Sequence, residues 1–176
     1  KFKPEGHIVA MFDLNNLKTC NDNLGHEQGD SYIIESAGMI KKAFGSYGNC
    51  YRIGGDEFCV LLYGISLSKC EQCISDFKKM LSDYNAAHPD SFPLNIACGY
   101  ELYDPDEDYD IGDTLRRADK IMYNEKFEMK KKNNEQVRWF LLNNFTPFSY
   151  ILLLKLCRNN FVFGWCYVIM LYAIIL

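Results

Sequence analysis

The sequence has no excess of positive charge. Its 176 residues include 19 Lys and Arg against 23 Asp and Glu, which gives a formal net charge of −4. Proteins that hold nucleic acid mainly through its phosphate backbone carry a surplus of basic residues, so we expect no nucleic-acid partner. The length suits one domain of ordinary size, and a hydrophobic content of 48% is enough for a buried core.

The sequence also lacks the cysteine pattern of secreted proteins and a signal peptide at its start. Its 8 cysteines follow no disulfide framework, so we expect a cytoplasmic, reducing setting. Cys70 and Cys73 form one C-x-x-C pair, but they lack the second pair of ligands that a zinc site needs. We interpret them as ordinary thiols.

Acidic residues are absent after position 138, where only Lys155 and Arg158 are charged. We therefore separate a domain at residues 1–134 from a hydrophobic tail at residues 135–176. The apolar run at 161–176 is shorter than the ~20 residues of a spanning helix. Three interpretations stay open: a membrane anchor within residues 139–176, an amphipathic or partner-covered segment, and an extension that is not native.

Apolar patterns in the first 134 residues predict alternating strands and helices. Strands are predicted at residues 7–14, 49–53, 57–63 and 94–100. Helices are predicted at residues 33–44 and 67–87, with an extra C-terminal helix that begins near Asp113 and ends at residues 130–132. The order β-α-β-β-α-β predicts an α+β fold with a ferredoxin-like antiparallel sheet and helices on one face.

Carboxylates from two strands are predicted to meet at one edge of this sheet. Asp13 ends the first strand, and Asp56 and Glu57 follow a Gly54-Gly55 turn. Adjacent strands lie about 5 Å apart, so Asp13 and Asp56 can converge. Such a pair suits Mg²⁺ and phosphate, because Mg²⁺ prefers oxygen ligands and shares them with phosphates. Solvated turn carboxylates are the alternative, and spacing alone does not exclude them.

Three blocks of sequence resemble the GGDEF family of diguanylate cyclases. The first is Arg52-Ile53-Gly54-Gly55-Asp56-Glu57-Phe58. The second, residues 12–30, is similar to the family pattern D-x-D/N-x-F/L-K-x-x-N-D-x-x-G-H-x-x-G-D. The third and weakest is residues 118–123 followed by Lys126. The blocks occur in the family's order and cover about residues 8–132.

The resemblance implies a homodimer that condenses two GTP molecules into cyclic di-GMP and releases two pyrophosphates. Each half-site would hold one GTP with Mg²⁺ or Mn²⁺. The metal ligands implied are Asp13, the Leu14 carbonyl, Asp56 and Glu57, and the catalytic residues implied are Asp56 and Glu57.

The resemblance also implies a set of substrate contacts. Asn21 and Asp30 match the positions that read guanine, since an amide and a carboxylate complement its donors and acceptor. A short turn at residues 15–18 would present backbone N–H groups to the phosphates, and Lys126 would add positive charge. The implied substrate-binding residues are Asn16, Leu17, Lys18, Asn21, Asp30, Gly54, Gly55, Lys126 and Lys130, the last standing where the family commonly has Arg.

Two features depart from the family pattern. Residues 45–48, Gly-Ser-Tyr-Gly, replace the Arg-x-x-Asp of product-inhibited cyclases, so we expect no product inhibition through that site. The family's upstream D-x-L-T-x-L-x-N-R pattern does not precede Phe2, so the resemblance predicts an N-terminally truncated domain. The alternatives to an active cyclase are a GTP-binding regulatory domain without turnover and a membrane-associated interaction module.

Overall fold

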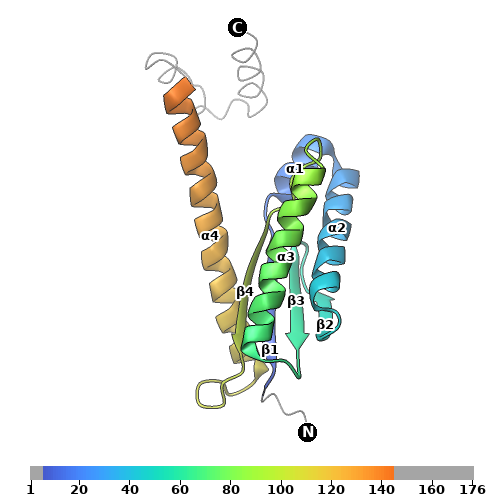
Figure 1. Cartoon of the computed structure of the whole chain (residues 1–176), viewed down its shortest axis with the longest axis vertical. Coiled ribbons are helices and arrows are strands. Elements are labelled where there is room, and N and C mark those ends of the chain that lie inside the picture. Colours follow the sequence, from blue (N-terminus) through green and yellow to red (C-terminus); the bar gives the residue numbers. More distant parts are fainter. Residues whose placement is uncertain (1–5, 145–176) are drawn as a thin grey trace. The chain divides into compact units, whose positions relative to one another are not determined.

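The computed structural model describes residues 6–144 of the chain. The chain divides into two compact units, Lys1–Met129 and Lys130–Leu176, and the strands found within residues 6–144 all lie in the first. The elements are β1 (Ile8–Leu14), α1 (Leu17–Leu24), α2 (His26–Phe44), β2 (Gly48–Arg52), β3 (Glu57–Leu62), α3 (Leu67–Ala87), β4 (Ile96–Leu102) and α4 (Ile111–Asn144) (Figure 1). The predicted α+β fold with its β-α-β-β-α-β order is confirmed.

The four strands form one antiparallel sheet in the order β2-β3-β1-β4. β1 pairs with β3 on one side and with β4 on the other, and all seven of its residues are buried. A strand covered on both faces needs apolar side chains on both, which explains the near-continuous apolar run of β1. Asp13 is the one charged residue in this strand.

One face of the sheet packs against α2 and α3. Phe12 of β1 lies 5.3 Å from Phe44 of α2 and 5.4 Å from Phe77 of α3, measured between ring centroids. All three rings are fully buried. This aromatic cluster joins the sheet to both helices, because large rings contribute much of the apolar area that folding buries.

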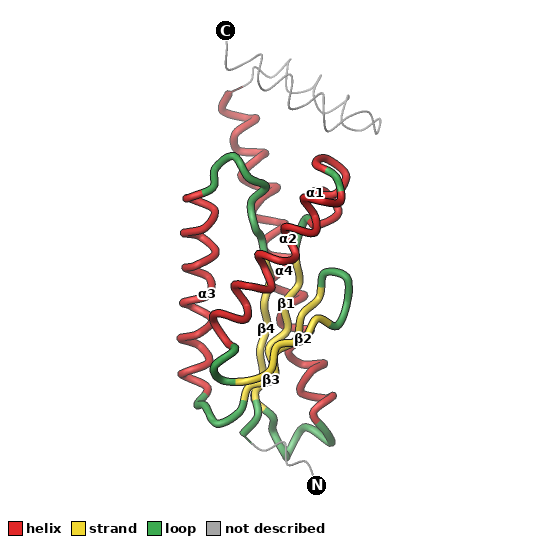
Figure 2. Tube along the Cα trace, turned by 90° about the vertical axis from the view of Figure 1, so that its right-hand side faces the viewer, coloured by secondary structure: helices red, strands yellow, loops and turns green. Residues whose placement is uncertain are grey.

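The opposite face packs against α4. Val9 and Met11 of β1 form a second buried cluster with Ala118 and Met122 of α4. The two predicted core helices, α2 and α3, share one face as expected, and the extra C-terminal helix, for which no face was predicted, covers the other. Figure 2 shows α3 and the start of α4 on opposite sides of the sheet. The physical reason is that the alternate residues of β1 are also apolar and need their own cover.

Close packing of α4 on the sheet depends on one glycine of β4. A Cβ added at Gly99 would lie 2.2 Å from the backbone nitrogen of Met122 and 2.3 Å from the carbonyl oxygen of Ala118. Real Cβ atoms do not approach backbone so closely. Gly99 therefore sets how near α4 comes to β4.

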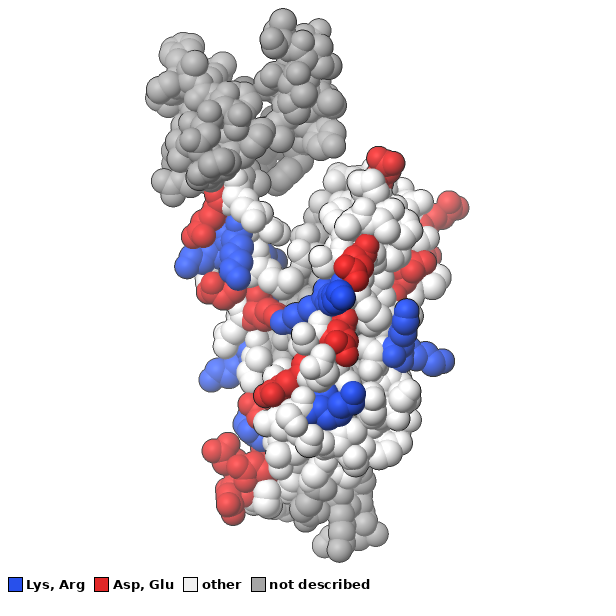
Figure 3. Space-filling view, in the orientation of Figure 1, with Lys and Arg blue, Asp and Glu red and all other residues white. Residues whose placement is uncertain are grey.

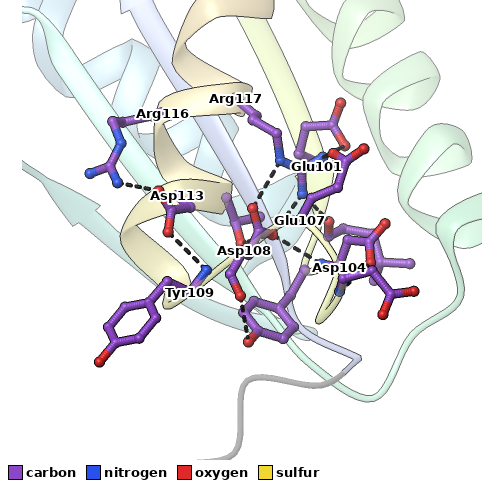
Figure 4. Close-up of polar contacts among 12 residues, drawn as sticks. Glu101, Asp104, Glu107, Asp108, Tyr109, Asp113, Arg116 and Arg117 are labelled. Carbon is purple, nitrogen blue, oxygen red and sulfur yellow. Dashed lines mark hydrogen bonds and ion pairs between the residues drawn. The ribbon is translucent and has the colours of Figure 1, made fainter.

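A buried carboxylate holds the loop between β4 and α4. The Asp108 side chain is 1% exposed and forms an ion pair with Arg117 at 2.7 Å (Figure 4). Asp108 also accepts hydrogen bonds from the Thr114 hydroxyl at 2.8 Å and from the Asp104 N–H at 2.9 Å. The hydrogen bond from Arg117 contributes most to lowering the pKa of Asp108 to about 2. This network fixes where α4 begins.

The outer edge of β4 is capped by Glu125 of α4. The backbone N–H of Cys98 donates to Glu125 Oε2 at 2.6 Å, and Lys78 of α3 pairs with the other carboxylate oxygen. A side chain on an edge N–H removes one of the groups to which another strand could bind.

Two helices differ from the sequence-based expectation. α1 was not predicted because its sequence is mostly polar and Cys20 is its one buried residue, so it has no apolar stripe. α4 continues to Asn144 instead of ending near residue 132. No proline or glycine interrupts residues 113–144, so nothing stops the helix. The proposed domain boundary at residue 134 stays a prediction, and the helix crosses it.

Within residues 6–144, no helix combines the length and hydropathy that a membrane crossing requires. The predicted membrane anchor rests mainly on residues 145–176, which lie outside the described residues. The three interpretations of the tail therefore stay open. Cys70 and Cys73 are both buried on α3, and burial raises the pKa of Cys70 to about 12.

Candidate active site

Two acidic residues face each other at the end of the sheet. Asp13 of β1 lies directly opposite Glu57 of β3 in the antiparallel register. Asp13 is two residues from Met11 on β1, Glu57 is two residues from Cys59 on β3, and Met11 and Cys59 both belong to the buried cluster that α4 covers. Residues two apart on a strand lie on the same face, so Asp13 and Glu57 are on the side of the sheet covered by α4. Residues that are directly opposite have Cβ atoms about 5 Å apart, and like charges there are destabilising without a cation nearby.

The glycine turn before β3 brings Asp56 to the same strand end. The Leu14 N–H donates to the Asp56 carbonyl at 2.9 Å, which ties this turn to the end of β1. Arg52 braces the turn by donating to the carbonyl oxygens of Gly54 at 3.2 Å and Gly55 at 2.7 Å. The backbone of Asp56 is thereby held beside Asp13 and Leu14.

Gly54 leaves room for the carboxylate of Glu57. A Cβ added at Gly54 would lie 2.7 Å from Glu57 Oε2, whereas a Cβ at Gly55 would meet nothing within 4 Å. Gly55 is exposed, and Gly54, Asp56 and Glu57 are half-buried. The two glycines therefore have different roles. The missing side chain of Gly54 makes room for the Glu57 carboxylate, whereas no atom lies close to the position of a Cβ at Gly55.

Lys126 of α4 forms an ion pair with Asp13. Its ammonium donates to Asp13 Oδ2 at 2.6 Å, and the two side chains are 24% and 5% exposed. The other carboxylate oxygen, Oδ1, is buried and has no hydrogen-bond partner. The sequence predicted Lys126 as a phosphate-side cation, and the structure places it on the carboxylate of the implied metal site.

The donor set fits a divalent cation that is shared with phosphate. Among residues 6–144, no three His, Cys, Asp or Glu side chains group closely enough to hold a metal by themselves. Mg²⁺ is usually held by one or two carboxylates together with phosphates and water. Asp13, with its unpartnered Oδ1, and the carboxylates that follow the glycine turn supply oxygen donors of that kind.

The turn after β1 is shorter than predicted. Asn15 and Asn16 form the turn, whereas Leu17 and Lys18 already belong to the first turn of α1. Asn16 adopts a left-handed conformation with φ 67°. The first N–H groups of a helix have no partner within the helix, and they favour anions. Residues 16–18 therefore offer backbone donors beside Asp13.

The two residues predicted to read guanine lie on consecutive helices. Asn21 is on α1 and half-buried, and Asp30 is on α2 and exposed. Gly29, directly before Asp30 on α2, is buried, and a Cβ there would lie 1.8 Å from Asn21 Oδ1. The glycine lets the Asn21 amide lie against the backbone next to Asp30.

A polar cluster near Asp13 was not predicted from the sequence. The Tyr32 hydroxyl of α2 donates to the Asn15 carbonyl at 2.8 Å and accepts the Asn95 N–H at 2.7 Å. The side-chain amide of Asn15 donates to Asn95 Oδ1 at 2.9 Å. Burial raises the pKa of Tyr32 to about 12, so the hydroxyl keeps its proton. No local sequence signal joins residues 80 positions apart.

Lys130 is the last of the predicted substrate-binding residues. Lys130 is exposed and belongs to the second unit, so its predicted phosphate role stays a prediction.

On the face shown in Figure 3, basic side chains alternate with acidic ones. A cavity of 190 Å³ lies beside α2, and Tyr32, Glu35, Tyr84 and Phe92 are among the residues that line it.

Comparison with protein families gives one match over most of the chain. The family described as "Diguanylate cyclase, GGDEF domain" matches residues 3–132. The diguanylate cyclase DgcS of Shewanella oneidensis is 28% identical over 118 residues, which cover 67% of this chain and 38% of that protein. The diguanylate cyclase DgcP of Escherichia coli is 30% identical over 129 residues, which cover 70% of this chain and 36% of that protein. The chain thus spans less than two fifths of the length of these relatives.

Solved structures show the same fold. The active GGEEF domain of a diguanylate cyclase from Vibrio cholerae has a TM-score of 0.62 and 24% identity, and covers 70% of this chain and 78% of that one. A sensory box/GGDEF family protein from Caulobacter crescentus has a TM-score of 0.57 and 26% identity, and covers 70% and 80%. With the family match and the arrangement around Asp13 and Glu57, these comparisons show that the chain belongs to the GGDEF family of diguanylate cyclase domains.

Proposed function

We propose that this domain is a diguanylate cyclase that condenses two GTP molecules into cyclic di-GMP and releases two pyrophosphates. The observation that carries the proposal is the register of β1 and β3, which places Asp13 opposite Glu57 beside the glycine turn. The family match over residues 3–132 and the cyclases among the curated relatives support the same reaction.

Asp13, the Leu14 carbonyl, Asp56 and Glu57 are the residues that would hold Mg²⁺ or Mn²⁺. When bound, a divalent cation offsets the charge of the triphosphate and lowers the pKa of a hydroxyl that attacks phosphorus. Among the described residues, Asp13 Oδ1 is the one carboxylate oxygen that is buried without a hydrogen-bond partner, and a bound cation would supply that partner.

The chain's own groups bind and orient the nucleotide. Asn21 and Asp30 pair with the edge of guanine, and they select against adenine, which lacks the matching donors. The backbone N–H groups of residues 16–18, the glycine turn and Lys126 bind the phosphates. The Lys126 ammonium uses one of its three N–H donors on Asp13, which leaves two for phosphate oxygens.

The reaction joins two nucleotides held by two protomers. The 3′-oxygen of one GTP attacks the α-phosphorus of the other, so an O–P bond forms and the bond to pyrophosphate breaks. Asp56 accepts the proton of the attacking hydroxyl. The same step, repeated with the roles exchanged, closes the ring, so each half-site contributes one substrate and the active form is a homodimer.

The test is product formation by the full chain. With GTP and Mg²⁺ or Mn²⁺, chromatography and mass spectrometry should detect cyclic di-GMP and two pyrophosphates per product. Asp56→Ala should abolish the product with an unchanged circular dichroism spectrum. Asp106→Ala, at an exposed aspartate of the β4–α4 loop, should retain it.

The outcomes separate the competing functions. Product from the full chain that persists in Asp56→Ala would exclude the assigned site. GTP binding without product in the unmodified chain would identify a regulatory GTP-binding domain instead. Neither binding nor product would leave an interaction module as the better interpretation.

A further inference from the structure

One buried hydroxyl joins three separate segments of the first unit. Tyr32 is 3% exposed on α2. Its hydroxyl reaches the turn after β1 through the Asn15 carbonyl, and it reaches the segment before β4 through the N–H and carbonyl of Asn95, at 2.7 and 3.2 Å. A phenol has one donor hydrogen and can accept, so these contacts use its hydrogen-bonding capacity.

The turn that this hydroxyl holds is tightly constrained. The Asn15 N–H donates to the Asn95 carbonyl at 2.8 Å, and the side-chain amides of both residues pair at 2.9 Å. The next residue, Asn16, has a φ of 67°, a left-handed conformation that asparagine adopts more readily than other residues with a side chain. The first backbone donors of α1 follow this residue directly.

Tyr32 also stands close in sequence to a proposed guanine-reading residue. Asp30 precedes it by two positions on α2, and Asn15 follows Asp13 by two positions on the other side of the hydrogen bond. The hydrogen bond from Tyr32 to Asn15 therefore joins the helix that carries Asp30, a proposed guanine contact, to the turn that follows Asp13, a proposed metal ligand.

We propose that Tyr32 is a positioning residue for GTP, because its hydroxyl fixes the turn that follows Asp13 at a set distance from Asp30 on α2. This inference rests on the proposed function and adds a residue that touches neither metal nor nucleotide. The ring of Tyr32 packs edge-on against Phe92 with centroids 6.0 Å apart, so the ring and the hydroxyl have separable roles.

The experiment uses two variants that each lose one buried hydroxyl from α2. Tyr32→Phe keeps the ring and removes its contacts to Asn15 and Asn95. Ser36→Ala is the matched control, because its hydroxyl is buried and bonds the Tyr32 carbonyl at 2.7 Å without touching the turn. The full chain is titrated with 3′-deoxyGTP and Mg²⁺, a probe without the attacking hydroxyl.

Tyr32→Phe should weaken 3′-deoxyGTP binding about tenfold, because it leaves the buried Asn15 carbonyl and the part-buried Asn95 N–H without the Tyr32 hydroxyl. Ser36→Ala should change it less than about twofold. Amide hydrogen exchange without nucleotide should accelerate at residues 15–18 and 95 in Tyr32→Phe and not in Ser36→Ala. Asn95→Ala, which keeps the Tyr32 hydroxyl but removes the amide pair with Asn15, is a second variant and should weaken binding in the same direction.

Binding by Tyr32→Phe and Asn95→Ala as tight as by Ser36→Ala would overturn the inference while the proposed function stands. If Tyr32→Phe does not fold, the hydroxyl serves the fold as a whole and not the nucleotide, which would also overturn the inference. Absence of 3′-deoxyGTP binding by the unmodified chain would remove the proposed function, and the inference with it.

Discussion

Asp13 and Glu57 occupy directly opposite positions on β1 and β3, on the side of the sheet that α4 covers. Two carboxylates in such a pair repel each other unless positive charge lies near them. Lys126 supplies that charge in the nucleotide-free chain by bonding Asp13 Oδ2 at 2.6 Å. The positive charge of Lys126 therefore offsets the repulsion between Asp13 and Glu57, and a substitution of any of the three should change the electrostatic energy of the other two.

Lys126→Met should destabilise the nucleotide-free chain by about 2 kcal/mol, because it leaves a buried carboxylate unpaired next to a second acid. The loss is smaller than for a fully buried pair, since the Lys126 side chain is 24% exposed. Thermal denaturation measures it, and Mn²⁺ should raise the melting temperature more in this variant than in the unmodified chain. Lys120→Met removes an exposed lysine of the same helix and should have little effect. Equal melting temperatures for the two variants would show that the ion pair does not stabilise the fold.

Stability should fall in acid as Asp108 becomes protonated. Its folded-state pKa of about 2 lies below the ordinary value of 3.8, so the network with Arg117 stabilises the fold above about pH 4. That contribution is lost as the pH falls from 4 towards 2. Asp108→Asn should lower the free energy of unfolding at pH 7 by about 2 kcal/mol, because it removes hydrogen bonds to a charged group.

The pH dependence itself distinguishes this carboxylate from its neighbours. The difference between Asp108→Asn and the unmodified chain should shrink as the pH falls and vanish near pH 2. Asp106→Asn, at an exposed position of the same loop, should behave like the unmodified chain throughout. Denaturant titrations at several pH values give both curves, and a constant difference for Asp108→Asn would contradict the assignment.

Gly99→Ala should destabilise the domain by about 3 kcal/mol, because its Cβ would meet backbone atoms of Met122 and Ala118 that cannot move aside cheaply. Gly38→Ala is the matched control, since a Cβ at this position of α2 would meet nothing within 4 Å. An alanine inside a helix is favoured over glycine, so the control should gain up to about 1 kcal/mol. Chemical denaturation gives both values, and opposite signs are the expected result.

Cyclic di-GMP should not inhibit the chain through the site that product-inhibited members of the family use. Residues 45–48 lack both charges of that motif, and a Cβ at Gly48 would lie 2.0 Å from the Leu61 carbonyl oxygen. The aspartate of the motif therefore has no room at this position of β2. Initial rates measured with added product should stay unchanged, and strong noncompetitive inhibition would show that this prediction is wrong.

The sheet could be predicted from the sequence because its signals are local. The apolar run of β1 and the glycine turn before β3 each fall within a few residues, and the helix at 67–87 agrees with α3, Leu67–Ala87. α1 escaped prediction because LKTCNDNL buries one side chain only. The cover of α4 on the second face could not be assigned, because the apolar repeat of a helix does not say which surface it meets.

The candidate site divides in the same way. Asp13, Asp56 and Glu57 were found because motif and strand order agree, although their roles stay proposals. The pairing of Lys126 with Asp13 joins residues 113 positions apart, and nothing near either residue indicates it. Tyr32 was overlooked since its ring suits an ordinary helix core, and the importance of its hydroxyl depends on a turn and a strand elsewhere.

The carboxylate of Glu125 over the Cys98 amide makes the two margins of the sheet unequal. At the β4 edge, the Cys98 N–H is already hydrogen-bonded to Glu125 of α4. The opposite edge strand, β2, is more exposed, and its Tyr51 is 48% accessible. Recruitment of an additional strand, whether from another molecule or from an aggregating neighbour, should therefore favour the β2 margin, and charged substitutions placed there should do most to keep concentrated protein monodisperse.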